Sequence, residues 1–233
     1  MENEILIQKP ALYIIATPIG NLKDITIRAI ETLKLCDLVL SEDTRKSKIL
    51  FQKYNIITPL KSFRVHHLKE DILYTIHQLE SYKAIGFITD AGTPGISDPV
   101  SHLIRYIREN KLNFPVIPIP GPSALSTALS ISGWQVNPTL FLGFLSNKST
   151  KRIKSLESYK NFEGCIVLFE SVHRIQKLLE EIFSVFPKRE VLIAREMTKK
   201  FEEYVIINKQ EFEKQKELFR TKGEFTVVIS PEK

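Results

Sequence analysis

Residues 84–99, AIGFITDAGTPGISDP, constrain the fold of this chain more than any other stretch. The first six are apolar or β-branched, which is typical of a buried strand. Gly92-Thr93-Pro94-Gly95 cannot continue a strand, and glycine lets the backbone approach a ligand closely. Asp98 is a good helix N-cap and Pro99 a good first helical residue. This order is typical of the ligand-binding edge of an open α/β sheet, although a plain βα turn with a capped helix explains it as well.

The size and composition of the chain indicate a globular protein with ample core. It has 233 residues, of which 43% are hydrophobic and 26% charged, enough for one large domain or two small ones. No apolar run approaches the roughly 20 residues that cross a bilayer, and Glu2 and Glu4 do not suit a signal or transit peptide. Cys36 and Cys165 stand alone, which excludes a disulfide framework and favours the cytoplasm.

The net charge of +6 is concentrated in two windows of the sequence. Between Thr44 and Lys69 there are seven lysines and arginines, two histidines and no acid. A second window without acid contains Lys148, Lys151, Arg152 and Lys154. Solvated helix faces have the same composition. The alternative is a polyanionic partner, because neutralising phosphates drives nucleic-acid binding.

The first half of the chain alternates expected strands with expected helices. Strands are predicted at residues 12–16, 37–41, 60–63, 84–89 and 114–119, and helices after Asp24 and at residues 46–53, 68–82, 100–108 and 123–132. This alternation predicts a parallel sheet with helices on both faces. The carboxyl ends of parallel strands share one edge, so the breaks at residues 17–21, 42–45, 90–95 and 120–123 should meet there.

The second half is organised differently. Strands are predicted at residues 140–144, 165–169, 191–195, 204–207 and 225–229, with helices at residues 150–159, 171–186 and 210–220. The less regular alternation after Glu196 predicts antiparallel pairing. We place a boundary near Pro120, between an α/β domain with a parallel sheet (residues 1–119) and an α/β domain with a mixed sheet (residues 120–233).

Several common motifs are absent. No Gly-x-Gly-x-x-Gly follows the first strand, and neither a phosphate-binding P-loop nor a Gly-x-Ser-x-Gly elbow occurs. His66-His67 has no third ligand at suitable spacing, and adjacent side chains diverge. We therefore expect no metal site, and a surface or RNA contact for His66.

Seven segments together resemble a known family. They are Thr17-Pro18-Ile19-Gly20-Asn21-Leu22 with Asp24-Ile25-Thr26, Glu42-Asp43-Thr44-Arg45, Asp90-Ala91-Gly92-Thr93-Pro94 with Ser97-Asp98-Pro99, Pro120-Gly121-Pro122-Ser123-Ala124, Gly143-Phe144, Phe169-Glu170-Ser171 with His173-Arg174, and Ala194-Arg195-Glu196-Met197-Thr198-Lys199. Each is weak alone, but as an ordered set from about residue 11 to 229 they are specific. The set resembles the rRNA small subunit methyltransferase I family, a branch of the tetrapyrrole methylase superfamily.

The resemblance implies transfer of a methyl group from S-adenosylmethionine to the ribose 2′-hydroxyl of a decoding-region cytidine in small-subunit (16S) rRNA. It also implies a tetrapyrrole-methylase-like α/β fold of two α/β/α domains with the cofactor cleft between them. The expected partners are the 30S subunit and a second copy of the chain, in the cytoplasm and without a membrane. Two departures concern RNA contact: many members carry a C-terminal helical extension beyond the last strand here, and His66-His67-Leu68 replaces the family's histidine, asparagine and acid.

The resemblance also implies which residues hold the cofactor. The rim loops match the positions where this superfamily contacts S-adenosylmethionine, with further walls from the second half of the chain. The implied set is Pro18, Asp90, Ala91, Gly92, Thr93, Ile96, Gly121, Ser123, Ala124, Phe169, Ala194 and Phe225. Ser123 could instead be only an N-terminal helix residue, and Asp90 only an Asx-turn former.

Catalysis and RNA binding need different side chains. The 2′-hydroxyl is a weak nucleophile, so a group that accepts its proton or stabilises the developing alkoxide helps. The candidates are Glu42, Asp43, Glu170 and Lys199, and the candidate RNA contacts are Arg45, Lys46, His66, Lys148, Lys151, Arg152 and Arg174. Glu42-Asp43 could instead merely pair with Arg45, and His173-Arg174 could cap a helix. Two other functions stay open: a methylase of small tetrapyrroles, and a non-catalytic RNA-binding assembly module.

Overall fold

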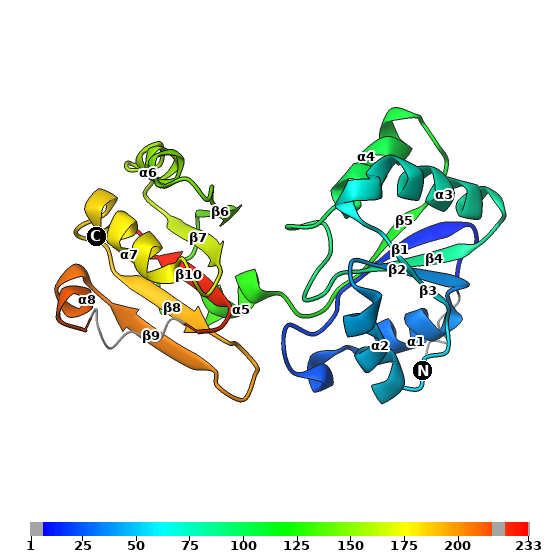
Figure 1. Cartoon of the computed structure of the whole chain (residues 1–233), viewed down its shortest axis with the longest axis horizontal. Coiled ribbons are helices and arrows are strands. Elements are labelled where there is room, and N and C mark those ends of the chain that lie inside the picture. The colour runs from blue at the N-terminus through cyan, green and yellow to red at the C-terminus, as the bar shows by residue number, and fades with distance from the viewer. Residues whose placement is uncertain (1–6, 216–221, 233) are drawn as a thin grey trace. The chain divides into compact units, whose positions relative to one another are not determined.

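The computed structural model describes residues 7–215 and 222–232 of the chain (Figure 1). It divides into two compact units, Met1–Ser123 and Ala124–Lys233. The division falls a few residues after Pro120. No helix in the described ranges combines the length and the apolar character that crossing a membrane requires.

The first unit is built on a parallel sheet. Its strands are β1 (Ala11–Ile15), β2 (Leu38–Ser41), β3 (Leu60–Ser62), β4 (Ala84–Ile88) and β5 (Val116–Ile119), in the spatial order β3-β2-β4-β1-β5. Every pairing in this sheet is parallel, as the alternation of strands and helices predicts. All residues of β1, β2 and β4 are buried, which explains why these strands are continuous apolar runs.

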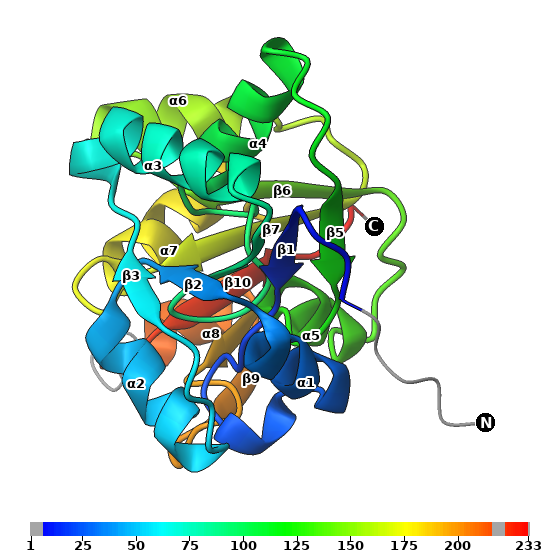
Figure 2. The same cartoon turned by 90° about the vertical axis from the view of Figure 1, so that its right-hand side faces the viewer.

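Helices cover both faces of this sheet, α3 and α4 on one side and α1 and α2 on the other (Figure 2). Their bounds are α1 (Ile27–Leu35), α2 (Thr44–Lys53), α3 (Leu68–Glu80) and α4 (Val100–Glu109), with 3₁₀ turns η1 (Leu22–Asp24) and η2 (Val65–His67). Each side of the sheet has its own core cluster, one containing Leu33, Val39 and Leu50, the other Leu40 and Phe87. The sheet is therefore the central layer of three.

The start of α4 differs by one residue from the prediction. The N-cap position belongs to Pro99, in helical conformation, and the helix begins at Val100 rather than at the proline. The Asp98 carboxylate nevertheless accepts hydrogen bonds from the N–H groups of Val100 (3.1 Å) and Gly95 (2.6 Å). Asp98 thus caps a free donor in the first turn of α4 and also holds the preceding loop through Gly95.

The second unit is built on a mixed sheet. Its strands are β6 (Thr139–Phe144), β7 (Cys165–Glu170), β8 (Val191–Arg195), β9 (Glu203–Ile207) and β10 (Phe225–Ile229), in the order β6-β7-β10-β8-β9. Only β6 and β7 are parallel; the three pairings that involve β8, β9 and β10 are antiparallel. The antiparallel pairing predicted after Glu196 is confirmed.

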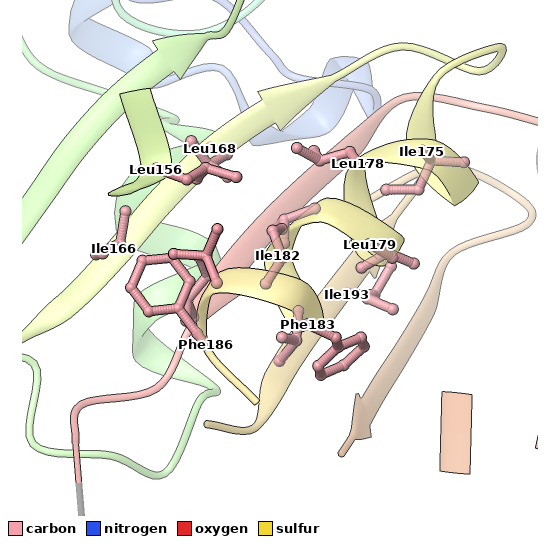
Figure 3. Close-up of a cluster of buried hydrophobic side chains, with 14 of the residues drawn as sticks. Leu156, Ile166, Leu168, Ile175, Leu178, Leu179, Ile182, Phe183, Phe186 and Ile193 are labelled. Atoms are coloured by element: carbon pink, nitrogen blue, oxygen red, sulfur yellow. The ribbon is translucent and has the colours of Figure 1, made fainter. Parts of the chain in front are cut away.

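Helices α5 (Ala124–Ser130), α6 (Ser149–Glu157), α7 (Ile175–Val185) and α8 (Lys209–Gln215) belong to this unit. The predicted continuation of α8 over residues 216–220 lies outside the described residues. In α7, Ile175, Leu178, Leu179 and Ile182 recur at helical spacing and form one buried face. That face packs onto the sheet and forms the core in Figure 3.

The helix α7 begins at Ile175, four residues later than predicted. The reason is local. The carboxylate of Glu170 accepts the N–H of Ser171 at 2.7 Å and the Nε–H of Arg174 at 2.7 Å, which stabilises a turn over these residues. The polar segment therefore serves as a loop after β7 rather than as the first turn of the helix.

Candidate functional site

The loops that follow β1 and β4 are joined directly. The N–H of Thr17 donates to the Gly92 carbonyl (2.9 Å), and the N–H of Gly92 donates back to Thr17 (3.1 Å), forming an isolated antiparallel bridge. The buried hydroxyl of Thr17 also donates to the carbonyl of Thr89 (3.2 Å). These bonds fix both loops at the carboxyl end of their strands.

The loop after β5 packs against the same place. The hydroxyl of Thr93 donates to the Pro122 carbonyl at 3.1 Å. Gly121 lies so close to β1 that an added Cβ would be 3.0 Å from the Cβ of Ala16. A side chain at residue 121 would therefore force the two loops apart.

The loop after β2 completes the rim, by which we mean residues 17–21, 42–45, 90–95 and 120–123. The carboxylate of Asp90 accepts the N–H of Asp43 (3.2 Å) and forms an ion pair with Lys46 (2.6 Å). The side chain of Asp90 thus ties the loop after β4 to the start of α2. These contacts confirm that the four breaks meet at one edge of the first sheet.

Gly92 gives a direct test of the rim geometry. Its φ of +82° lies in the left-handed region, and an added Cβ would be 3.3 Å from Cγ2 of Ile19. We expect Gly92→Ala to lower the free energy of unfolding by about 1–2 kcal/mol, because an L-residue is strained at this φ. Urea unfolding measures it, with Gly20→Ala in the same rim as the comparison. Equal stabilities of Gly92→Ala and the parent protein would contradict the assigned conformation.

Glu42 is the rim carboxylate best suited to accept a proton near neutral pH. Burial raises the pKa of Glu42, and the nearby charges of Asp98 and Asp90 raise it further. Lys46 lowers it in part, and the resulting pKa is about 7. The pKa of Asp98 is also raised by burial, against the effect of its backbone hydrogen bonds. A carboxylate with a pKa near the working pH is a candidate general base.

Asp43 has a different role from its neighbour Glu42. It is the N-cap of α2, its carboxylate accepts the N–H of Arg45 at 2.9 Å, and it forms an ion pair with the Arg45 guanidinium at 2.7 Å. These hydrogen bonds hold the pKa of Asp43 well below its ordinary value. A carboxylate so held accepts protons poorly. The alternative of simple pairing with Arg45 therefore applies to Asp43.

The remaining first-unit candidates lie in or beside the rim. Pro18 and Ala91 belong to its loops, Ile96 follows it and is exposed, and Ser123 ends the unit. Ala124 begins α5 in the second unit.

The exposed side chains of Arg45, Lys46 and His66 are on α2 and η2, close in sequence to the carboxyl ends of β2 and β3.

The second unit has its own edge of candidate residues. In the sheet register, Thr226 of β10 pairs with Phe169 on one side and Ala194 on the other, and Phe225 pairs with Glu170. Three implied cofactor walls, Phe169, Ala194 and Phe225, thus lie at one edge on neighbouring strands. Ala194 and Phe225 are buried, whereas Phe169 is only partly covered.

Lys199 is held as a cation by two carboxylates. Its ammonium group donates to Glu196 (2.9 Å) and Glu224 (2.8 Å). Burial lowers the pKa of Lys199, but the two hydrogen-bonded carboxylates outweigh it, so the pKa is raised. The loop is strained as well, because Glu196 and Thr198 have φ of +49° and +65°. Lys199 can stabilise negative charge but cannot serve as a neutral base. The sequence did not identify Glu224 as its partner.

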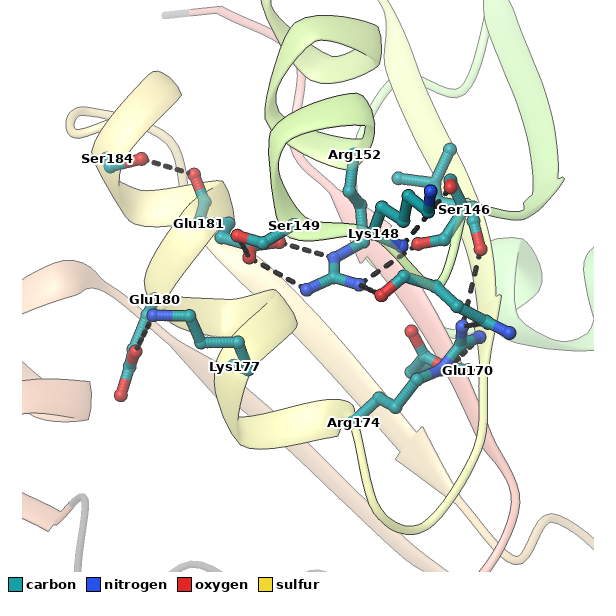
Figure 4. Close-up of polar contacts among 12 residues, drawn as sticks. Ser146, Lys148, Ser149, Arg152, Glu170, Arg174, Lys177, Glu180, Glu181 and Ser184 are labelled. Atoms are coloured by element: carbon teal, nitrogen blue, oxygen red, sulfur yellow. Dashed lines mark hydrogen bonds and ion pairs between the residues drawn. The ribbon is translucent and has the colours of Figure 1, made fainter.

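Glu170 and Arg174 pair with each other inside the unit (Figure 4). The Glu170 side chain has no exposed surface, and its Oε1 accepts from Arg174. Its Oε2 is buried and has no hydrogen-bond partner among the described residues. Such a group cannot reach a ribose in this arrangement.

Arg152 corrects the prediction of RNA contacts. Only 3% of the residue is exposed, and its guanidinium forms a two-pronged ion pair with the equally buried Glu181. Its Nη1 group donates to the backbone carbonyls of Ser146 and Asn147. Because the guanidinium is buried against these partners, it does not present itself to a phosphate in solvent, and Arg152 is a structural residue. Its neighbours Lys148, Lys151 and Lys154 are exposed.

The two-sheet fold and the glycine-rich rim define the class of protein. The family model described as "Tetrapyrrole (Corrin/Porphyrin) Methylases" matches residues 11–212. Solved structures of the same fold include a diphthine synthase, with a TM-score of 0.72 and 13% identity over 95% of this chain and 90% of that one. Another is the methyltransferase CobJ, with a TM-score of 0.71 and 12% identity, covering 95% and 94%.

Curated relatives narrow the class to one family. A protein of Leptospira biflexa is 44% identical over 97% of this chain and 93% of its own, and one of Thermotoga maritima is 41% identical over 94% and 97%. A third, from Borrelia garinii, is 43% identical over 94% and 98%. All three are called ribosomal RNA small subunit methyltransferase I, and the chain belongs to this methyltransferase family.

Proposed function

We propose that the protein transfers a methyl group from S-adenosylmethionine to the 2′-hydroxyl of a cytidine ribose in the decoding region of small-subunit (16S) ribosomal RNA. Its main support is the family, because relatives that match nearly the whole chain are named for this RNA. We further propose that it acts as a homodimer on the 30S subunit, in the cytoplasm. The exposed lysines and arginines of both windows suit a phosphate-rich partner.

The rim suits S-adenosylmethionine, the methyl donor of this family. A Cβ at residue 92 would meet Ile19 and one at residue 121 would meet Ala16, so the two glycines let the rim loops pack closely together. Ile96 and Ala91 offer exposed apolar surface, and Asp90 offers a carboxylate to a cationic group. Within the first unit, Gly92, Thr93, Gly121 and Ser123 would contact the donor.

The chemistry needs positioning and one proton acceptor. When bound, S-adenosylmethionine supplies an electrophilic methyl group on a sulfonium. The ribose oxygen forms the new C–O bond as the C–S bond breaks, and holding the two in line supplies much of the acceleration. Glu42, with its pKa of about 7, would take the proton from the 2′-hydroxyl.

A labelling experiment tests the proposed function. The protein is incubated with methyl-labelled S-adenosylmethionine and, separately, with unmethylated 30S subunits or a precorrin. We expect label on the subunits, and on 2′-O-methylcytidine after nuclease digestion and mass spectrometry. Label on the tetrapyrrole alone would establish the small-molecule alternative. Absence of donor binding in calorimetry would instead favour the non-catalytic RNA-binding module.

Asp90 gives a test of the cofactor assignment. We expect Asp90→Ala to weaken S-adenosylmethionine binding more than tenfold, because the change removes a carboxylate and unties the rim loop from Lys46 and Asp43. Lys151→Ala, on the exposed surface of α6, should change donor affinity less than about twofold. Isothermal titration calorimetry measures both. Equal effects of the two substitutions would count against the rim as the donor site.

A further inference from the structure

One exposed aromatic side chain in the second unit stands beside a cationic loop. Phe144, the last residue of β6, is 57% exposed. Four residues on, Lys148 precedes α6, whose first turns carry the exposed Lys151. An exposed phenylalanine leaves apolar surface in water, and a neighbouring group of lysines is poorly suited to an apolar protein partner. The pair of features fits a partner with both flat rings and phosphates.

The ring of Phe144 is supported from beneath. Its centroid lies 5.6 Å from that of Phe169, which contacts Phe141 edge-on at 4.9 Å. Phe141 and Phe169 belong to neighbouring strands, so they form a fixed base for the outer ring. A ring held on one side and open on the other is suited to stacking against a nucleobase.

The β6–α6 loop (residues 145–148) is held by two arginines (Figure 4). Arg152 donates to the carbonyls of Ser146 and Asn147, and Arg174 donates to the Asn147 side chain. Each arginine is also paired with a buried carboxylate, Glu181 and Glu170 respectively. The backbone between Phe144 and Lys148 is therefore held, so the attachment points of the ring and of the Lys148 side chain keep their relative position.

We propose that Phe144, Lys148 and Lys151 form a contact surface for an unpaired RNA segment, in which a base stacks on Phe144 and the lysines bind adjacent phosphates. This rests on the proposed function and names the form of its substrate: single-stranded rather than helical RNA. Paired bases are already stacked on each other and cannot lie flat on Phe144. Arg152 acts as a positioning residue, through the loop.

The test uses the full chain without methyl donor, so that binding is separated from transfer. Probes are a short single-stranded oligoribonucleotide and the same strand annealed to its complement. We expect Phe144→Leu to weaken single-strand binding about tenfold or more, with little change for the duplex, and Phe144→Tyr to restore it. The control is Tyr82→Leu, an exposed aromatic of the first unit at the opposite end of β4 from the rim. Equal losses on both probes, or none, would overturn the stacking role.

Salt dependence tests the two lysines, and a substitution of Arg152 tests how the β6–α6 loop is held. Replacing Lys148 and Lys151 by Met should lower the slope of log affinity against log salt by about 1 to 2, whereas Phe144→Leu should leave it unchanged. Arg152→Lys should also weaken single-strand binding several-fold. Its matched control is Arg189→Lys. Arg189 is equally buried, and it donates to the backbone carbonyls of Gly164, just before β7, and Ser230, just after β10, away from the β6–α6 loop. Equal binding losses in both arginine variants would overturn the positioning role.

The outcomes separate this proposal from the proposed function. If Phe144→Leu binds single strands normally while the parent protein methylates 30S subunits, the contact surface is wrong and the proposed function stands. The opposite outcome is also informative. If the parent protein transfers no methyl group to 30S subunits, but Phe144→Leu binds single strands more weakly than the parent, the contact surface stands and the proposed function is wrong.

Discussion

Glu42→Gln is expected to lower kcat for methyl transfer by roughly 10²–10⁴-fold while leaving the affinity for S-adenosylmethionine within about twofold. The amide keeps the size of the side chain but cannot take a proton from the ribose hydroxyl. Single-turnover methylation of 30S subunits, with donor affinity from calorimetry, separates the two effects. Glu31→Gln, an exposed carboxylate on α1 outside the rim, is the matched control. A kcat for Glu42→Gln within threefold of the parent would remove Glu42 from the reaction.

The pH dependence follows from the raised pKa. In the parent protein kcat should rise with pH through an apparent pKa near 7, because only the ionised form of Glu42 accepts the proton. This limb should disappear from the residual activity of Glu42→Gln. A limb that persists unchanged in the variant would belong to another group.

The same carboxylate should cost stability at high pH. The folded pKa of Glu42, about 7, exceeds the ordinary value of 4.5, so folding retains a proton that the unfolded chain has lost between these values. Stability therefore falls as the pH rises through this window, and the loss is complete above it. We expect Glu42→Gln to be more stable than the parent at pH 8 by about 1–2 kcal/mol, discounted for partial exposure, and equal near pH 4. A residue that weakens the fold and drives the reaction is typical of an active site.

The rim shows how much of the site local sequence can predict. Each of its loops follows an apolar run and is marked by glycine, proline or a capping residue, and a parallel sheet brings all such loops to one edge. Those two facts predict that Gly92 and Gly121 meet without any knowledge of side-chain contacts. The hydrogen bonds that lock the rim, such as Thr93 to Pro122, depend on atomic distances and could not be predicted.

The second unit shows where sequence reasoning fails. Lys148, Lys151, Arg152 and Lys154 form one window without an acid, which predicts a solvated helix face or a surface for a polyanion. On α6, however, Arg152 is buried and pairs with Glu181, which lies 29 residues away on α7. Likewise Lys199 is neutralised in part by Glu224, 25 residues further along the chain. Charge windows describe neighbours in sequence, whereas the pKa and exposure of a cation depend on neighbours in space.

Breaking the Arg152–Glu181 pair should have the largest effect on stability of any change considered. We expect Arg152→Met to lower the free energy of unfolding of the second unit by about 3–5 kcal/mol, because it leaves the buried Glu181 carboxylate without a cation. Urea unfolding followed by circular dichroism measures the loss. Lys177→Met, which removes the exposed ion pair with Glu180 on the same helix as Glu181, should cost less than about 0.5 kcal/mol.

The double variant Arg152→Met/Glu181→Leu distinguishes an unpaired charge from lost packing. Replacing both partners by apolar side chains of similar size removes the isolated charge, so most of the stability should return. The loop carbonyls of Ser146 and Asn147 would still lack their donor, and the β6–α6 loop should therefore exchange its amide hydrogens faster than in the parent. If the double variant is as unstable as Arg152→Met, the pair stabilises the unit through its loop contacts rather than through charge. Recovered stability with a faster-exchanging loop would separate the two roles of Arg152, neutralising Glu181 and holding the lysine-bearing loop.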